Sequence, residues 1–194
     1  MEFLSYLISG ISLGSVYAII ALGYTMVYGI AKMLNFAHGD VIMVGGYISF
    51  CAMFYLHLPN VVAVLLAVVV CTVLGIFIER LAYKPLRNAP SLAVLITAIG
   101  VSYFLQNSAL LIWKAAARSY TPVVTGTASL LDGRLSISYI SLLTIAVCVV
   151  IMLALTTFVN KSKMGKAMRA CSEDKAAAQL MGINVNATIS ATFA

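Results

Sequence analysis

Long stretches without a single charged residue decide what this chain can fold into. Five such runs occupy residues 3–31, 41–78, 88–113, 135–160 and 176–194. A helix needs about 20 apolar residues to cross a hydrocarbon core about 30 Å thick. The runs therefore predict an all-α fold, a polytopic membrane helical bundle.

The composition agrees with this class and excludes others. Of the 194 residues, 62% are hydrophobic and 9% are charged, whereas soluble domains carry about 25% charged residues. The net charge of +6 does not indicate a nucleic-acid partner, because the charges are bunched between the apolar runs and form no basic face. The four cysteines have no CxxC or Cys/His spacing, so neither a metal nor a cofactor is expected.

The second run is too long for one helix and contains a turn-like stretch at 57–60, which includes Pro59 and Asn60. The predicted spans lie near 4–30, 41–57, 60–78, 91–112 and 138–159, and a sixth begins near 185. A helix that begins near 185 cannot cross a membrane by Ala194. We therefore expect residues 1–194 to form a single transmembrane domain that is incomplete at its C-terminal end and truncated after about five spans.

Lysine and arginine predict the orientation. The segment 160–175 is the richest in these residues, so it is expected in the cytoplasm. Counting spans back from it places 80–87 and Lys32 on the same side and the N-terminus outside. The segment 113–137 is then external, where its glycines and alternating apolar residues suggest a small hairpin. It fits the charge rule least well, because it holds Lys114, Arg118 and Arg134.

A polar cluster interrupts the apolar pattern between the first two spans. Asn35, His38 and Asp40 lie within six positions, with Gly39 beside them. The span after them has only 17 residues, about 25 Å as a helix, so the cluster is predicted at, or just inside, the cytoplasmic edge. In one interpretation Gly39 ends a segment and Asp40 caps the next helix. In the other the cluster is a helix break that gates a pathway.

The fourth span contains two neighbouring amides, Gln106 and Asn107, past its middle. Amides in lipid need partners, so these two either hydrogen-bond another helix or line a water-filled path. Both alternatives stay open. The candidate pathway residues are therefore Asn35, His38, Gly39, Asp40, Gln106 and Asn107.

The basic segment 161–183 ends in what reads as a short helix. Ser172 is expected to cap its start, Glu173 and Asp174 fall in its first turn, and Gly182 suits a left-handed C-terminal cap. An apolar stripe precedes it, formed by Met164, Met168 and Cys171. The segment is either an interfacial helix on anionic lipid or a docking element for a soluble partner.

Motifs for common enzyme chemistry are missing from the sequence. There is no GxxxxGK[ST], HExxH or GxSxG pattern, so we expect this chain to have no ATPase site of its own. Two rival interpretations use the polar cluster. In one, a channel or secondary transporter moves protons through His38 and Asp40; in the other, a membrane-embedded enzyme uses His38 as a base.

Four stretches together resemble a known family. They are GSVYAIIALGYTMVYGIAKMLNFAHGD (14–40), IERLAYKPLR (78–87), AIGVSYFLQN (98–107) and MGKAMRACSEDKAAAQLMGI (164–183). In this order they resemble the permease subunit of branched-chain amino acid ABC importers, the LivH type. Permeases for urea and short amides are similar, so the substrate is less well specified than the family.

The resemblance implies an ATP-driven importer in the bacterial cytoplasmic (inner) membrane. It implies two cytoplasmic ABC ATPase subunits, a homologous second permease and an external binding protein that delivers the amino-acid substrate. The ATP site then belongs to another polypeptide. The resemblance makes 164–183 the coupling loop that meets an ATPase, which favours docking over the interfacial helix. Its candidate coupling residues are Gly165, Met168, Arg169, Glu173, Asp174 and Gly182.

Overall fold

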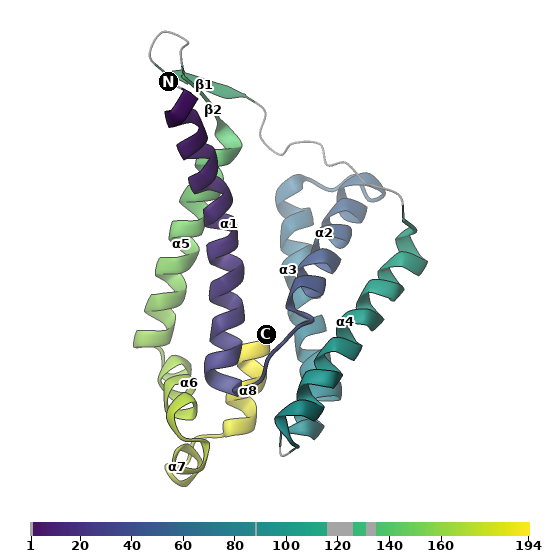
Figure 1. The fold of residues 1–194 in the computed structure, drawn as a ribbon, viewed down its shortest axis with the longest axis vertical. Helices are drawn as coiled ribbons and strands as arrows, with labels where there is room; N and C mark the ends of the chain where they lie inside the picture. Colours follow the sequence, from purple (N-terminus) through teal and green to yellow (C-terminus); the bar gives the residue numbers. More distant parts are fainter. Residues whose placement is uncertain (1, 88, 116–125, 131–134) are drawn as a thin grey trace. The chain divides into compact units, whose positions relative to one another are not determined.

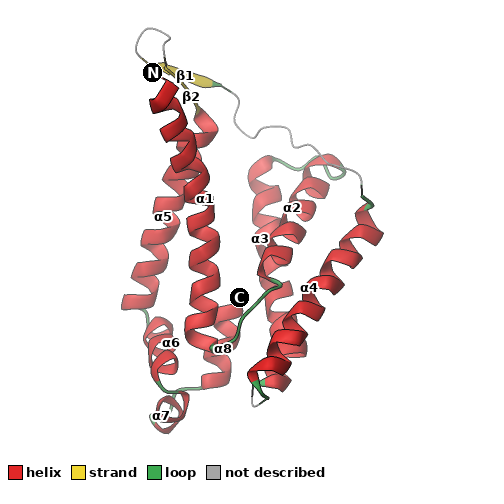
Figure 2. Ribbon diagram, in the orientation of Figure 1, coloured by secondary structure: helices red, strands yellow, loops and turns green. Residues whose placement is uncertain are grey.

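The computed structural model describes residues 2–87, 89–115, 126–130 and 135–194, and these residues are mostly helical (Figures 1 and 2). The five long helices are α1 (Glu2–Ala31), α2 (His38–Phe54), α3 (Asn60–Ile78), α4 (Ser91–Trp113) and α5 (Tyr139–Lys161). Three shorter helices follow: α6 (Lys163–Glu173), α7 (Lys175–Leu180) and α8 (Val185–Phe193). Helix α3 continues as a π-helix, η1 (Glu79–Tyr83), and a 3-10 turn, η2 (Lys84–Leu86).

The membrane-spanning helices match the predicted spans. Four segments are long and apolar enough to cross a bilayer, namely Tyr6–Ala31, Asn60–Leu86, Ser91–Trp113 and Tyr139–Lys161. Helix α2 is shorter, with 17 residues, and α8 begins where the sixth helix was expected. The predicted fold class, a helical membrane bundle, is confirmed.

The loop between α4 and α5 contains the predicted hairpin. Strand β1 (Thr127–Leu130) pairs antiparallel with β2 (Leu135–Ser138), and Thr127 lies opposite Ser138. Arg118 and Arg134, two of the basic residues counted in this loop, lie outside the described residues. Because the two strands are only four residues each, the fold class remains all-α.

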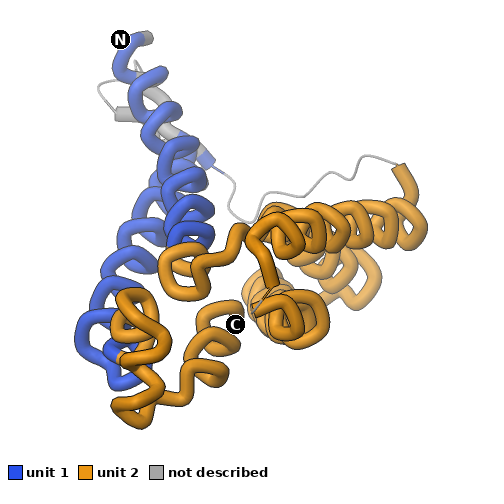
Figure 3. Tube along the Cα trace, turned by 60° about the horizontal axis from the view of Figure 1, so that its bottom comes forward, with its two compact units in different colours: residues 1–25, 121–166 blue, residues 26–120, 167–194 orange. Residues whose placement is uncertain are grey.

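The chain divides into two compact units, which are coloured separately in Figure 3. Unit 1 comprises residues 1–25 and 121–166, and unit 2 comprises 26–120 and 167–194. Within unit 1, the Cys148 thiol of α5 donates to the Ser15 carbonyl of α1 at 3.0 Å. Unit 2 contains the end of α1, helices α2 to α4, most of α6, and α7 and α8.

The core of unit 2 forms where several helices meet a non-helical stretch. Its buried members are Ala31, Met33, Ala37, Ile78, Tyr83, Val94, Ala98, Leu105 and Ile189. Two glycines permit close packing around it. A Cβ at Gly45 would lie 2.7 Å from Cys71 Sγ, and one at Gly75 would lie 2.5 Å from the Phe193 carbonyl oxygen. Small residues allow helices to approach in this way, so α3 packs tightly against both α2 and α8.

Candidate functional site

Helix α1 is followed by residues 32–37, which form no helix and lead into α2 (Figure 1). Helix α1 ends as Lys32 adopts a left-handed conformation, with φ at 57°. Met33 and Ala37 of the stretch are buried in the core of unit 2. We call residues 32–37 the deep break, for reasons given below. Backbone without helical hydrogen bonds is tolerated inside a membrane only where protein buries it or water reaches it.

Asn35 is held in the deep break by a residue from another helix. Its side chain is 8% exposed, and its Oδ1 accepts a hydrogen bond of 2.9 Å from the hydroxyl of Tyr83. Tyr83 lies in η1 and is itself buried. Because a buried amide without a partner costs free energy, this bond stabilises the non-helical conformation at Asn35.

Asp40 has a partner of a similar kind. Its side chain is also 8% exposed, and its Oδ1 accepts a bond of 3.0 Å from Nε2 of Gln106 in α4. Gln106 donates to the Ser102 hydroxyl as well, at 3.1 Å. The structure thus joins two residues that the sequence singled out separately, across 66 positions of the chain.

The contact with Gln106 fixes the depth of Asp40. Gln106 lies about 22 Å along α4 from Ser91, on a helix about 34 Å long. Asp40 therefore lies well inside the span. From the sequence it was expected at, or just inside, the cytoplasmic edge. The physical reason is that α2 stays short and the non-helical residues 32–37 make up the rest of the crossing. The interpretation of Asp40 as a cap is also wrong, since α2 begins at His38 and its N-cap position is Ala37.

The other predicted pathway residues have different surroundings. His38 is half-buried at the first position of α2, and Gly39 beside it is exposed. Asn107 is exposed and donates to the Tyr103 carbonyl of its own helix at 2.7 Å. The structure therefore brings Asp40 and Gln106 together, and Asn107 bonds within α4. No group of three or more His, Cys, Asp or Glu side chains that could hold a metal occurs in the described part of the chain.

The second helix break lies between α6 and α7, and we call it the surface break. Asp174 is exposed, and its Oδ1 accepts from the backbone amides of Ala176 and Ala177 at 2.7 and 3.1 Å. Asp174 is thus the N-cap of α7. The predicted cap, Ser172, is wrong: it lies within α6 and its hydroxyl donates to the Arg169 carbonyl. A carboxylate caps as well as a hydroxyl, and the helix boundary lies two residues later than the pattern suggested.

Helix α7 ends as the sequence predicted. Gly182 has a φ of +82°, and its amide donates to the Gln179 carbonyl at 3.0 Å. The next amide, of Ile183, donates back to Ala178, also at 3.0 Å. This pair of bonds is the Schellman motif, which favours glycine at the left-handed position.

The remaining residues of 161–183 divide between the surface and the interior. Met168 and Cys171 are buried and pack with Ile30 and Ala178, so most of the predicted apolar stripe faces the protein. Arg169 and Glu173 are exposed. Gly165 is buried, and a Cβ there would lie 2.5 Å from the Phe158 carbonyl oxygen, so α6 needs a glycine to turn off the end of α5.

Sequence reasoning missed a buried ionic group at the end of α3. Glu79 is fully buried and forms a salt bridge with Arg87. Ser190 of α8 donates to the second oxygen of Glu79 at 2.7 Å, and Arg87 also donates to Asn186. A glutamate directly after 38 uncharged positions (41–78) was the available signal, because a charge at that place is buried only when it is paired.

Lys175 connects the two breaks. It is the first residue of α7, and its Nζ donates to the carbonyl of Ala31, the last residue of α1, at 2.7 Å. Burial, with a contribution from the nearby Arg87 guanidinium, lowers the pKa of this amine from its ordinary value of 10.5. The surface break is thereby attached to the start of the deep break.

Four helices long and apolar enough to cross a bilayer, with buried polar groups paired to other helices near the break between α1 and α2, define a multi-pass helical membrane protein. Comparison with known proteins gives the family. The family model described as "Branched-chain amino acid transport system / permease component" matches residues 6–194. The chain belongs to this family, as the sequence motifs indicated.

Named relatives agree. The chain is 41% identical over 203 residues to "High-affinity branched-chain amino acid transport system permease protein BraD" of Pseudomonas aeruginosa, covering 99% of this chain and 66% of the relative. It is 41% identical over 204 residues to the corresponding LivH of Salmonella typhimurium, covering 100% and 66%. A probable LivH of Methanocaldococcus jannaschii is 29% identical over 178 residues, covering 88% and 55%. The chain thus spans about two thirds of the length of the first two. No solved structure matches.

Proposed function

We propose that the full-length protein is the permease subunit of an ATP-driven importer for branched-chain amino acids. The observation that carries this proposal is the 41% identity, over nearly the whole chain, to relatives named as branched-chain amino acid transport permeases. The spans and the deep break are consistent with it, because transporters commonly place discontinuous helices at their binding or gating sites.

The remaining parts of the importer follow from the family. The protein works with two cytoplasmic ABC ATPases, a homologous second permease and an external binding protein that delivers the substrate. It lies in the bacterial inner membrane with its N-terminus outside, which puts the basic segment 161–183 in the cytoplasm. The sequence has no phosphate-binding loop, so ATP binds to the ATPase subunits.

The deep break acts as a gate in the transport path. A carboxylate is costly inside a span and is kept there where it faces protein or water. Asp40 and Asn35 are each held by one hydrogen bond to another helix, so a modest shift of that helix releases them. The released polar groups and the non-helical backbone then face a substrate that carries both charges of an amino acid and an apolar side chain.

The segment 161–183 couples this gate to the ATPases. Its tip offers Leu180 and Met181, which are 89% and 84% exposed, and the preceding helix α6 carries the exposed charges of Arg169 and Glu173. An apolar centre with a polar rim is typical of a protein interface. Movement of α7 reaches the deep break through the bond from Lys175 to Ala31.

Reconstitution tests the main proposal. The full-length protein, purified with whichever subunits accompany it, is placed in proteoliposomes that contain ATP, and the binding protein is added outside. We expect uptake of labelled leucine that requires ATP. Uptake driven by a pH gradient without ATP indicates a secondary transporter, and uptake of urea in place of leucine indicates the related amide permease. Conversion of substrate without net uptake indicates an enzyme.

Substitutions in the gate and in the segment 161–183 test these two parts of the mechanism separately. His38→Ala is expected to reduce uptake while assembly stays normal; normal uptake contradicts the gate.

Leu180→Asp with Met181→Asp is expected to abolish co-purification of the ATPases, and the apolar exchange Leu180→Met with Met181→Leu is the matched control. Retained ATPases in the Asp variant contradict the docking role. Glu173→Lys is also expected to weaken association with the ATPases. Asp174 is left unchanged in this variant, because it caps α7.

A further inference from the structure

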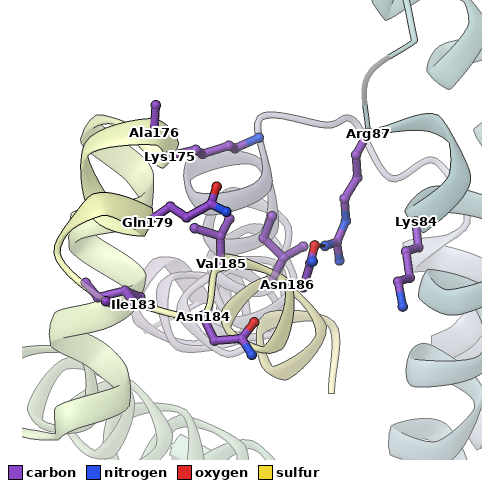
Figure 4. Close-up of a pocket in the computed structure, with 11 residues that line it drawn as sticks. Lys84, Arg87, Lys175, Ala176, Gln179, Ile183, Asn184, Val185 and Asn186 are labelled. Carbon is purple, nitrogen blue, oxygen red and sulfur yellow. Dashed lines mark hydrogen bonds between the residues drawn. The ribbon is translucent and has the colours of Figure 1, made fainter.

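Two cavities in unit 2 share a pair of cationic side chains. The larger, about 820 Å³, is lined by Lys84, Arg87 and Lys175 and by the amide side chains of Gln179, Asn184 and Asn186. Figure 4 shows Lys84 and Arg87 on one wall and Lys175 and Gln179 on the opposite one. The smaller cavity, about 450 Å³, also includes Arg87 and Lys175 in its lining. These two cations therefore border both cavities.

The charge around the two cavities is one-sided. Lys32 adds a further cation to the smaller cavity, and neither Asp nor Glu occurs among the described residues that line either cavity. Glu79 neutralises Arg87 from the interior. Lys175 bonds a neutral carbonyl, and Arg87 and Lys32 both help to lower its pKa, after burial. Lys32, Lys84 and Lys175 have no carboxylate beside them in the described linings, so an anion bound near them is stabilised.

The smaller cavity differs in its remaining lining. It is mostly apolar, with Leu34, Leu86, Val94 and Leu95 among its residues. Leu92, at the second position of α4, also lines it and is 66% exposed. A cationic cavity beside a mostly apolar one, with Arg87 and Lys175 bordering both, matches a molecule with an anionic head and a hydrocarbon tail.

We propose that this paired cavity binds an anionic phospholipid, with its phosphate between Arg87 and Lys175 and the start of an acyl chain against Leu92 and Leu95. An amino acid fits less well, because its ammonium group would lie among the cationic side chains and the described lining contains no carboxylate to balance its charge. Free phosphate leaves the apolar compartment without a role. The smaller cavity borders the start of the deep break through Lys32 and Leu34, but the proposal does not depend on the proposed transport function.

The test measures lipid binding to the full-length protein in detergent, by native mass spectrometry with dioleoyl phosphatidylglycerol and dioleoyl phosphatidylcholine as probes. We expect the anionic lipid to bind more tightly. Lys84→Gln with Lys175→Gln is expected to weaken it by about five-fold for each lysine removed. Lys84→Arg with Lys175→Arg keeps the charge and is expected to retain binding.

The matched control is Lys161→Gln with Lys163→Gln, which removes the same charge from two exposed positions outside both cavities. It is expected to leave binding unchanged. Equal binding of both lipids, equal loss in the control variant, or no loss in the cavity variant overturns the proposal. Inorganic phosphate and leucine form two further arms. If inorganic phosphate competes for the site as strongly as the lipid does, the acyl chain has no role in binding. If leucine displaces the lipid, the cavity is a substrate site instead.

Discussion

The two helix breaks of unit 2 are stabilised in opposite ways. At the surface break, the exposed Asp174 caps the start of α7 through backbone amides two and three residues away. At the deep break, the polar groups are buried and their partners come from 48 and 66 positions away. The difference teaches that a break in water needs only local capping, whereas a break within a span needs side chains from other helices.

The largest loss of stability is expected when Asp40 loses its hydrogen-bond partner. Gln106→Leu leaves a buried carboxylate without its donor, so we expect the free energy of unfolding to fall by about 2 kcal/mol, measured by equilibrium unfolding in mixed micelles. Asn107→Leu is the matched control, because Asn107 bonds only to its own helix among the contacts recorded for it. If both variants lose the same stability, the bond to Asp40 is not what holds the deep break.

A double variant sharpens this prediction. Asp40→Leu combined with Gln106→Leu removes both polar partners, and we expect most of the stability to return. Uptake by the full-length protein is expected to stay low, because the gate has lost its polar groups. Recovered uptake would assign the pair a purely structural role.

The next largest loss of stability is expected when the hydrogen bond from Tyr83 to Asn35 is removed. Tyr83→Phe deletes the hydroxyl that bonds Asn35 and keeps the ring in the core. We expect a loss of about 1 kcal/mol in the free energy of unfolding, measured in the same way. Tyr103→Phe is the control, since the Tyr103 ring is exposed and only its backbone carbonyl accepts the Asn107 bond. An unchanged free energy in Tyr83→Phe contradicts a stabilising role for the bond.

The surface break is expected to respond only locally. Asp174→Ala removes the cap of α7, at a cost of about 1 kcal/mol to that helix. Amide hydrogen exchange is expected to speed up in α7, while the free energy of global unfolding stays constant. Faster exchange that spreads to α2 or α4 contradicts the separation of the two breaks.

The smallest effect concerns the residue that joins them. Because the pKa of Lys175 lies below its ordinary value of 10.5, more of its amine is neutral and nucleophilic at a given pH. The pH midpoint of its labelling by an amine reagent, followed by mass spectrometry, is therefore expected below 10.5. In Lys32→Gln one neighbouring cation is gone and the midpoint is expected to move up; a midpoint that does not move contradicts the electrostatic contribution of Lys32.

The sequence predicted those features that depend on nearby residues. Charge-free runs located the spans because length and hydropathy alone decide whether a helix crosses a membrane. Gly182 was correctly assigned because a left-handed cap is a local property. Asp40 was placed too close to the edge because its depth depends on Gln106, and the burial of Met168 depends on Ile30. Neither partner is close in the sequence, so no local pattern contained this information.

The buried carboxylate of Glu79 ties the π-helical end of α3 to Arg87 and to Ser190 of α8. Removing either partner leaves a charge without compensation, and such a loss is strongly destabilising. Single substitutions at Glu79 or Arg87 are thus expected to be selected against, whereas paired replacement by apolar residues is tolerated. Across many relatives, these two positions should therefore covary, with Ser190 following them more loosely.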